Sequence, residues 1–333
     1  MESKFTTANE IKDIAEQVKN RTDAVGGLKN VYCVACGGSL AGLYPLEYLL
    51  KCESPSLAVY SMTSNEFVHA TPVKVGEDAM VVLCSISGTA ETVEAAKKAK
   101  ELGAAVVTLS GAANTPLSEQ GDYHMVYAGI SENPDDYDST NMAMVLRFGF
   151  ELLRLYDDYA NYEAAMAGFE VLNDSIGKAV KRVSKRADIF GEEHKDDEVI
   201  YTVGSGPCLN VAYMESICML LEMEWINSST IHSGELFHGP FEVADFDTPF
   251  IMFMSEGKTR ALDDRALRFL ERYSGRVTII DAKELGVSII APEVEEYFSA
   301  LYTWAVAYRY TQSLAESKNH PLLDRRYMFK VEY

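Results

Sequence analysis

The chain has 333 residues, of which 47% are hydrophobic and 24% are charged, a composition typical of globular proteins. Its 50 Asp and Glu outnumber its 30 Lys and Arg, and the resulting net charge of −20 excludes nonspecific binding to nucleic acid or to an anionic membrane surface. No apolar run of about 18 residues predicts a membrane span, and the N-terminus lacks the apolar segment of a signal peptide. We therefore expect a cytoplasmic protein, long enough for two domains.

The first half of the chain predicts an N-terminal helix followed by four strands that alternate with helices. The helix is expected at residues 5–25. Apolar runs typical of buried strands begin near positions 31, 57, 79 and 104, and the stretches between them predict helices. Short apolar strands alternating with helices are typical of a parallel sheet covered on both faces.

The second half repeats this order of segments. Counterparts of the first, third and fourth strands lie at 200–207, 249–259 and 276–282, and residues 140–195 between the halves predict helix alone. The fold class is therefore α/β, with two doubly wound, flavodoxin-like parallel-sheet domains related by an internal repeat. The expected parts are an N-terminal helix (1–28), a first α/β domain (29–160), a helical connection (161–195), a second α/β domain (196–315) and a C-terminal tail (316–333).

The six cysteines do not form a disulfide framework in a chain of this length. Cys33 and Cys36 make a C-x-x-C pair, which invites a redox or zinc interpretation. No second ligand pair follows, and the pair lies in an apolar run that ends in glycines. We interpret both as packed strand and loop cysteines and predict no metal site.

Three loops in the first half follow predicted strands and open predicted helices, where free backbone amides can bind anions. The loop at 36–42 lacks the third glycine of a dinucleotide fingerprint, and no acid ends the second strand, so a nicotinamide site is not expected. The loop at 85–92 contains four hydroxyl residues, more than the one that a helix cap needs. The sequence therefore favours binding of a single phosphate monoester there.

Three glutamates interrupt the otherwise apolar predicted helix at 208–226. They are Glu215, Glu222 and Glu224. Burial would raise the pKa of such a carboxylate and suit it to act as a general base. Glu222 and Glu224 cannot share a helix face, and periodicity alone does not decide which of them reaches solvent.

A loop rich in glycine and proline follows this helix and carries His232, Glu235 and His238. Histidine is the usual proton donor near neutral pH, whereas a histidine in a surface loop without a role is equally common. The chain contains no Ser-His-Asp elbow and no H-E-x-x-H motif, so hydrolases of those types are not indicated.

Together these segments resemble the sugar isomerase (SIS) family over almost the whole chain. Its first loop, A-C-G-x-S, is matched at Ala35–Ser39, and its phosphate loop, S-x-S-G-x-T, is matched at Ser85–Thr89 with one residue fewer. Its catalytic glutamate lies sixteen residues before the histidine of G-E-x-x-H-G-P, which is matched at Gly234–Pro240. The resemblance thus selects Glu222 as the base and His238 as the acid.

The resemblance also implies which residues hold the substrate. They are Gly38, Ser39, Ser85, Ser87, Thr89 and Glu235. It implies a homodimer or higher homo-oligomer with a shared active site, into which His238 comes from the neighbouring subunit. No metal or organic cofactor is implied.

The sequence is most similar to the branch of the family that contains the fructosamine-6-phosphate deglycases. The isomerase half of glucosamine-6-phosphate synthase has a lysine in its tail, where this chain has Arg325, Arg326 and Tyr327. The resemblance implies conversion of a fructosyl-amino acid 6-phosphate, such as fructoselysine 6-phosphate, into glucose 6-phosphate and the free amine. The alternatives are an aldose–ketose isomerase of a 6-phosphosugar and a non-catalytic sugar-phosphate sensor.

Overall fold

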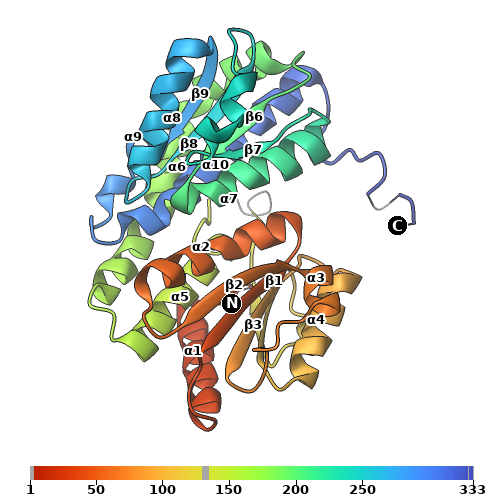
Figure 1. The fold of residues 1–333 in the computed structure, drawn as a ribbon, viewed down its shortest axis with the longest axis vertical. Coiled ribbons are helices and arrows are strands. Elements are labelled where there is room, and N and C mark those ends of the chain that lie inside the picture. The colour runs from red at the N-terminus through yellow and green to blue at the C-terminus, as the bar shows by residue number, and fades with distance from the viewer. Residues whose placement is uncertain (1–3, 130–134, 329, 333) are drawn as a thin grey trace. The chain divides into compact units, whose positions relative to one another are not determined.

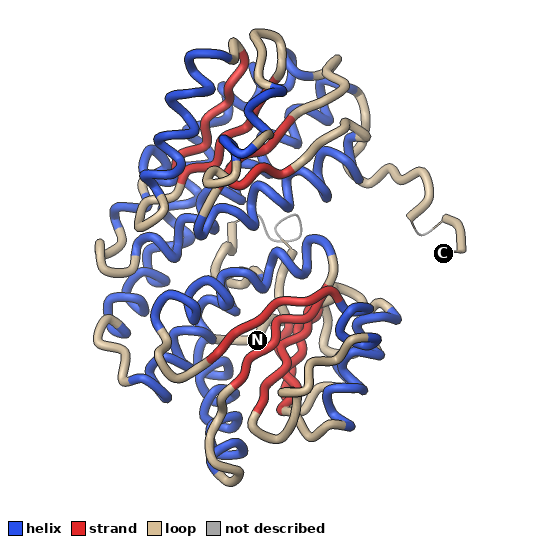
Figure 2. The backbone as a smooth tube through the Cα atoms, in the orientation of Figure 1, coloured by secondary structure: helices blue, strands red, loops and turns tan. Residues whose placement is uncertain are grey.

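The computed structural model describes residues 4–129, 135–328 and 330–332. The chain divides into two compact units, unit 1 at Met1–Asn173 and unit 2 at Asp174–Tyr333, and the long helix α6 (Tyr162–His194) contributes to both. Strands form the central layer of each unit and helices cover its faces (Figure 2). Within the described ranges, no helix combines the length and the apolar character needed to cross a membrane.

Unit 1 is an α/β layer structure that begins with a helix (Figure 1). Its strands are β1 (Asn30–Ala35), β2 (Ala58–Thr63), β3 (Ala79–Cys84), β4 (Ala105–Ser110) and β5 (Tyr123–Val126), and its helices are α1 (Ala8–Asp23), α2 (Gly37–Glu53), α3 (Ser64–His69), α4 (Ala90–Glu101), the 3₁₀ turn η1 (Ser118–Gln120) and α5 (Asn141–Asp157). Helix α1 begins at Ala8, three residues after the expected start, because Thr7 and Glu10 form a reciprocal capping box.

All strands of the first sheet are parallel, in the order β2-β1-β3-β4-β5. This is the flavodoxin-like order, whose topological switch point lies between β1 and β3. Every residue of β1, β3 and β4 is buried, as their apolar runs predict. The short polar strand β5 was not predicted, because its residues (YHMV) lack the apolar run that marked the other four strands.

Unit 2 repeats the plan with one strand fewer. Its strands are β6 (Tyr201–Gly204), β7 (Thr230–His232), β8 (Pro249–Met254) and β9 (Arg276–Asp281), and its helical segments are η2 (Gly206–Cys208), α7 (Leu209–Met214), η3 (Glu215–Glu224), η4 (Leu236–His238), η5 (Pro240–Val243), α8 (Arg260–Tyr273), α9 (Ala282–Leu285), η6 (Val287–Ile289) and α10 (Glu295–Lys318). The order β7-β6-β8-β9 is again parallel, with the switch point between β6 and β8.

The single regular helix expected at 208–226 is corrected by the structure. The segment contains a 3₁₀ turn, a short α-helix and a π-helix, η3, over Glu215–Glu224. The amide of Trp225 bonds to the carbonyl of Leu220, five residues back, which is the π pattern. π-Helical turns are rare and are frequently found at functional sites, so this stretch is of particular interest.

Candidate active site

The first loop at the switch point of unit 1 joins β1 to α2. Cys36 is exposed and precedes the helix, whereas Cys33 is buried within β1. Gly37 has a φ of 54°, in the left-handed region that favours glycine. Gly38 and Ser39 follow in the first turn of α2, half-buried, and the hydroxyl of Ser39 is a hydrogen-bond partner of the buried thiol of Cys84.

The second loop at this switch point joins β3 to α4. Ser85 is buried, and its hydroxyl oxygen accepts the amides of Gly88 (3.2 Å) and Thr89 (3.0 Å). Gly88 has a φ of 80°, and a Cβ there would lie 2.9 Å from the backbone nitrogen of Leu117. The loop therefore owes its tight shape to Ser85 and to a glycine that has no room for a side chain.

Two of the four hydroxyl residues of this loop are exposed. Ser87 and Thr89 lie at the surface, whereas Ser85 is turned inward to hold the loop. The hydroxyl of Thr89 lies 3.1 Å from that of Thr92, which lies 2.9 Å from that of Ser64. Thr89 precedes the twelve-residue helix α4 and makes no side-chain cap bond to its amides. Exposed hydroxyls beside free helix amides suit a bound phosphate.

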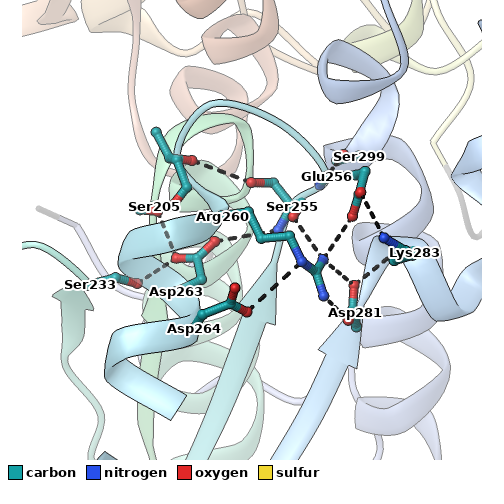
Figure 3. A network of polar contacts seen from close by, with 11 residues as sticks. Ser205, Ser233, Ser255, Glu256, Arg260, Asp263, Asp264, Asp281, Lys283 and Ser299 are labelled. Carbon is teal, nitrogen blue, oxygen red and sulfur yellow. Dashed lines mark hydrogen bonds and ion pairs between the residues drawn. The ribbon is translucent and has the colours of Figure 1, made fainter. Parts of the chain in front are cut away.

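The corresponding edge of unit 2 is filled by a side chain of its own (Figure 3). Asp263, on α8, is fully buried, and its Oδ1 accepts the hydroxyls of Ser205 (2.6 Å) and Ser233 (2.7 Å). The amide of Ser255 lies 3.4 Å from its Oδ2. Burial raises the pKa of this carboxyl, although the hydrogen bonds act in the opposite direction.

Arg260, also on α8, joins this network through bonds to acidic side chains (Figure 3). Its guanidinium binds both oxygens of Asp281, at 2.9 and 2.6 Å, and also Glu256 at 3.0 Å. Lys283 pairs with the other oxygen of Glu256 at 3.0 Å. Hydrogen bonds to Asp281 raise the pKa of the guanidinium further. Because these charges are already paired with one another, we interpret the cluster as structural.

Glu222 lies on the exposed side of the π-helix, at a pocket of about 350 Å³. The pocket is lined by Leu221, Glu222, Trp225, Ile226, Asn227, Arg325, Arg326, Tyr327 and Met328. Nε and Nη2 of Arg325 lie 2.9 and 2.8 Å from Oε1 of Glu222. Both of these contacts use Oε1, so they leave Oε2 of Glu222 for another group. The sequence patterns predicted no role for Arg325 or Arg326.

Glu224, two residues further on, points into the protein. Its side chain is fully buried, with Oε2 3.6 Å from Nζ of Lys318 on α10. Burial raises the pKa of Glu224 to about 7, against the influence of Lys318. The structure thus answers the question that periodicity left open: Glu222 reaches the surface pocket and Glu224 does not.

Glu215 begins the same π-helix and is also buried. Its Oε1 accepts the hydroxyl of Thr311 at 2.6 Å, and Oε2 has no hydrogen-bond partner among the described residues. Burial raises the pKa of Glu215 to about 8, and the charge of Glu224 raises it further. A protonated carboxyl is the form that suits such surroundings.

His238 and Glu235 lie in the exposed loop between β7 and β8. Glu235 precedes the 3₁₀ turn η4, and the amide of His238 donates to the carbonyl of Glu235 at 2.9 Å. Both side chains are exposed. His238 is not among the residues that line the Glu222 pocket, and no described hydrogen bond or ion pair joins the two. Their pairing in one site stays a prediction.

Comparisons with known proteins place the chain in a family. Residues 28–144 match the SIS domain. The chain is 37% identical over 325 residues to fructosamine deglycase FrlB of Bacillus subtilis, covering 97% of both proteins. The chain belongs to the SIS family.

Two further proteins are similar over most of this chain. Fructoselysine 6-phosphate deglycase of Escherichia coli is 25% identical over 273 residues, 82% of this chain and 77% of that protein. The crystal structure of a candidate phosphosugar isomerase from Salmonella typhimurium superposes with a TM-score of 0.95 and 43% identity, covering 100% of this chain and 99% of the other. The predicted α/β fold with two parallel sheets is therefore confirmed.

Proposed function

We propose that this SIS-family chain is a deglycase that converts a fructosyl-amino acid 6-phosphate and water into glucose 6-phosphate and the free amine. The observation that carries the proposal is the 37% identity to fructosamine deglycase FrlB along 97% of both chains. The glutamate that the family motif selects lies at a pocket, on a π-helical turn, which supports a catalytic role.

In the proposed reaction, Glu222 moves a proton between two carbons of the sugar. The substrate carries its amine on C1 and a ketone at C2. Removal of a C1 proton by the carboxylate gives an enaminol, and return of a proton to C2 gives the imine of glucose 6-phosphate. Water then hydrolyses the imine and releases the amine. The carboxylate of Glu222 is suited to this transfer because Arg325 contacts only its Oε1, so that Oε2 can take up the proton.

The remaining predicted residues are assigned to binding and to proton donation. His238 would protonate oxygen as the ring opens and as charge develops, a contribution of about 10²–10⁴-fold for such a group. The first turn of α2 and the loop before α4 would hold the phosphate; the residues are Gly38, Ser39, Ser85, Ser87 and Thr89. Glu235 would contact the sugar.

His238 is proposed to act in the site of a neighbouring subunit of a homodimer. Its exposure, and its absence from the residues that line the Glu222 pocket, support an action outside its own chain. Mixing inactive Glu222→Gln and His238→Asn chains should then restore part of the activity, because a mixed dimer has one site with both groups intact. Verified mixed dimers without activity would show that His238 acts within its own chain.

An aldose–ketose isomerase of a 6-phosphosugar is the second candidate. The observation in its favour is the 43% identity to the Salmonella protein, which is described as a candidate phosphosugar isomerase. An isomerase needs the same proton transfer but releases no amine.

The test is to incubate the protein with a panel of fructosyl-amino acid 6-phosphates, their unphosphorylated forms and free 6-phosphosugars. The deglycase forms glucose 6-phosphate and an equal amount of free amine from the phosphorylated adducts alone. Interconversion of free sugar phosphates without turnover of the adducts would favour the isomerase. Equal turnover of phosphorylated and unphosphorylated adducts would contradict the assignment of the phosphate loop.

A further inference from the structure

The pocket beside Glu222 holds a surplus positive charge. The charged residues that line it are Glu222, Arg325 and Arg326. Arg325 directs two nitrogens at Glu222 and donates its third, Nη1, to the carbonyls of Leu322 (2.6 Å) and Asp324 (3.0 Å). Its charge and its donors are therefore already engaged. Arg326 is the cation of this pocket whose charge no described carboxylate balances.

The guanidinium of Arg326 is held in place by an aromatic ring. Its Cζ lies 4.1 Å from the centre of the Trp225 ring. The Trp225 ring also packs edge-on against His320, at 4.3 Å between centres, and Nε2 of His320 lies 2.9 Å from the carbonyl of Met223. A guanidinium stacked on a ring keeps its in-plane N–H groups available for a planar acceptor.

The backbone of Trp225 is itself unusual. Its φ of 58° places a bulky residue in the left-handed region, which costs free energy and persists only where other contacts require it. This conformation ends the π-helix, and it places the ring in the same pocket lining as Glu222. The proposed base, Glu222, and the Trp225 ring on which Arg326 stacks therefore lie at the same end of the π-helix.

We propose that Arg326, supported by Trp225, binds the carboxylate of the amino acid that the substrate carries on its C1 nitrogen. The inference rests on the proposed function. Glu222 takes its proton from C1, so the group attached to the nitrogen of C1 lies beside Glu222. A carboxylate matches the planar donors of a guanidinium. Asn227 and Tyr327 line the same pocket and add an amide and a hydroxyl to this subsite.

The net charge of the chain favours a local cationic subsite for an anionic substrate. At −20 the protein repels an anionic substrate at long range, and a fructosyl-amino acid 6-phosphate carries a carboxylate in addition to its phosphate. A local unpaired arginine offsets this repulsion for the second anion. The substrate phosphate is the other anion that could occupy Arg326, and the two occupants predict different results.

The test compares two adducts that differ in one carboxylate, fructosyl-glycine 6-phosphate and fructosyl-methylamine 6-phosphate. We expect Arg326→Gln to lower kcat/KM for the glycine adduct by about 10- to 100-fold, mainly through KM, as for loss of a charged hydrogen bond. Turnover of the methylamine adduct should change no more than in the control, Arg272→Gln, which removes an exposed arginine stacked on Tyr273. Arg326→Lys should retain part of the preference for glycine.

Equal losses on both adducts would show that Arg326 binds the phosphate or supports the fold, and would overturn the proposal. No loss on either adduct would overturn it as well. If the wild type releases no glucose 6-phosphate from either compound, the proposed function fails, and calorimetric titration of the same compounds decides the subsite alone. The proposed subsite is supported if the wild type binds the glycine adduct more tightly than the methylamine adduct and Arg326→Gln abolishes this difference. Equal binding of the two adducts, or no binding of either, overturns it.

Discussion

The two sheets end in loops of the same design, but the hydroxyls at the two edges have different hydrogen-bond partners. The loop after β1 and the loop after β6 each contain a glycine with a positive φ, which is 54° at Gly37 and 50° at Gly206. Ser85 follows the last residue of β3 and Ser255 follows the last residue of β8, and a turn and a helix come next in each unit. Both units thus present hydroxyls and helix N-termini at a switch point.

The difference lies in the side chain that those hydroxyls meet. In unit 1, Ser64 bonds to Thr92, another neutral hydroxyl. In unit 2, Ser233 and Ser205 bond to Asp263, a buried carboxyl within the protein. Unit 2 therefore supplies its own charged acceptor, whereas in unit 1 the hydroxyls of Ser64, Thr89 and Thr92 pair with one another. In the proposed function, the loops of unit 1 bind the phosphate and the π-helix of unit 2 carries the base.

The largest effect is expected from Glu222→Gln, which tests whether unit 2 carries the proton transfer. The variant keeps the shape of the side chain but removes the base, so kcat should fall by at least about 10²-fold with little change in melting temperature. Exchange of the substrate C1 hydrogen with deuterated water should stop as well.

Glu224→Gln is the matched control, since Glu224 lies on the same π-helix and is buried away from the pocket. It should cost far less activity. Full activity of Glu222→Gln together with an inactive Glu224→Gln would show that the base is assigned to the wrong glutamate.

Asp263→Ala is expected to have the next largest effect, on stability. It leaves two buried hydroxyls and an amide without their acceptor, which should lower the free energy of unfolding by about 2–4 kcal/mol, measured by urea titration. Inorganic phosphate should then raise the melting temperature of the variant more than that of the wild type. A variant that phosphate does not stabilise differently would mean that the edge of unit 2 is not a filled anion site.

The buried glutamates give a third difference, in the response to pH. Buried Glu47 in unit 1 has Lys51 and Ser61 as hydrogen-bond partners, whereas Glu215 and Glu224 keep oxygens without a hydrogen-bond partner among the described residues. Because their pKa values are raised on folding, to about 8 and about 7, their stabilising contribution is full below the unfolded value near 4.5. It is lost as pH rises through 7 and 8.

The free energy of unfolding should therefore fall by about 1–3 kcal/mol between pH 6 and pH 9. Glu215→Gln or Glu224→Gln keeps a neutral side chain at all these pH values, so each should flatten the profile measured by urea titration. An unchanged pH profile in both variants would show that other groups cause the dependence.

Gly88→Ala is expected to have the smallest effect and to act on the open loop of unit 1. A side chain at a φ of 80°, 2.9 Å from the backbone of Leu117, should shift the loop, cost about 1–2 kcal/mol of stability and raise KM for the phosphorylated substrate. Gly76→Ala, where a Cβ meets nothing within 4 Å, is the control. A KM equal to that of Gly76→Ala would show that this loop does not bind the substrate phosphate.

The sequence by itself determined the order of the elements and the repeat. Buried parallel strands are continuous apolar runs, so the residues alone predict β1, β3, β4 and β8. The resemblance to the SIS family selected Glu222 over Glu224, and the structure places Glu222 at the pocket. These features depend on neighbouring residues along the chain, which is why local patterns contain them.

Tertiary structure alone decided how the polar side chains are used. Whether Asp263 faces solvent or fills the edge of its own sheet depends on Ser205 and Ser233, which are 58 and 30 residues away. The contact of Arg325 with Glu222 spans 103 residues. The π-helix likewise meets a distant segment, since Thr311 on α10 donates its hydroxyl to Glu215, which is 96 residues away. Such pairings form only when distant segments meet, so no local period in the sequence records them.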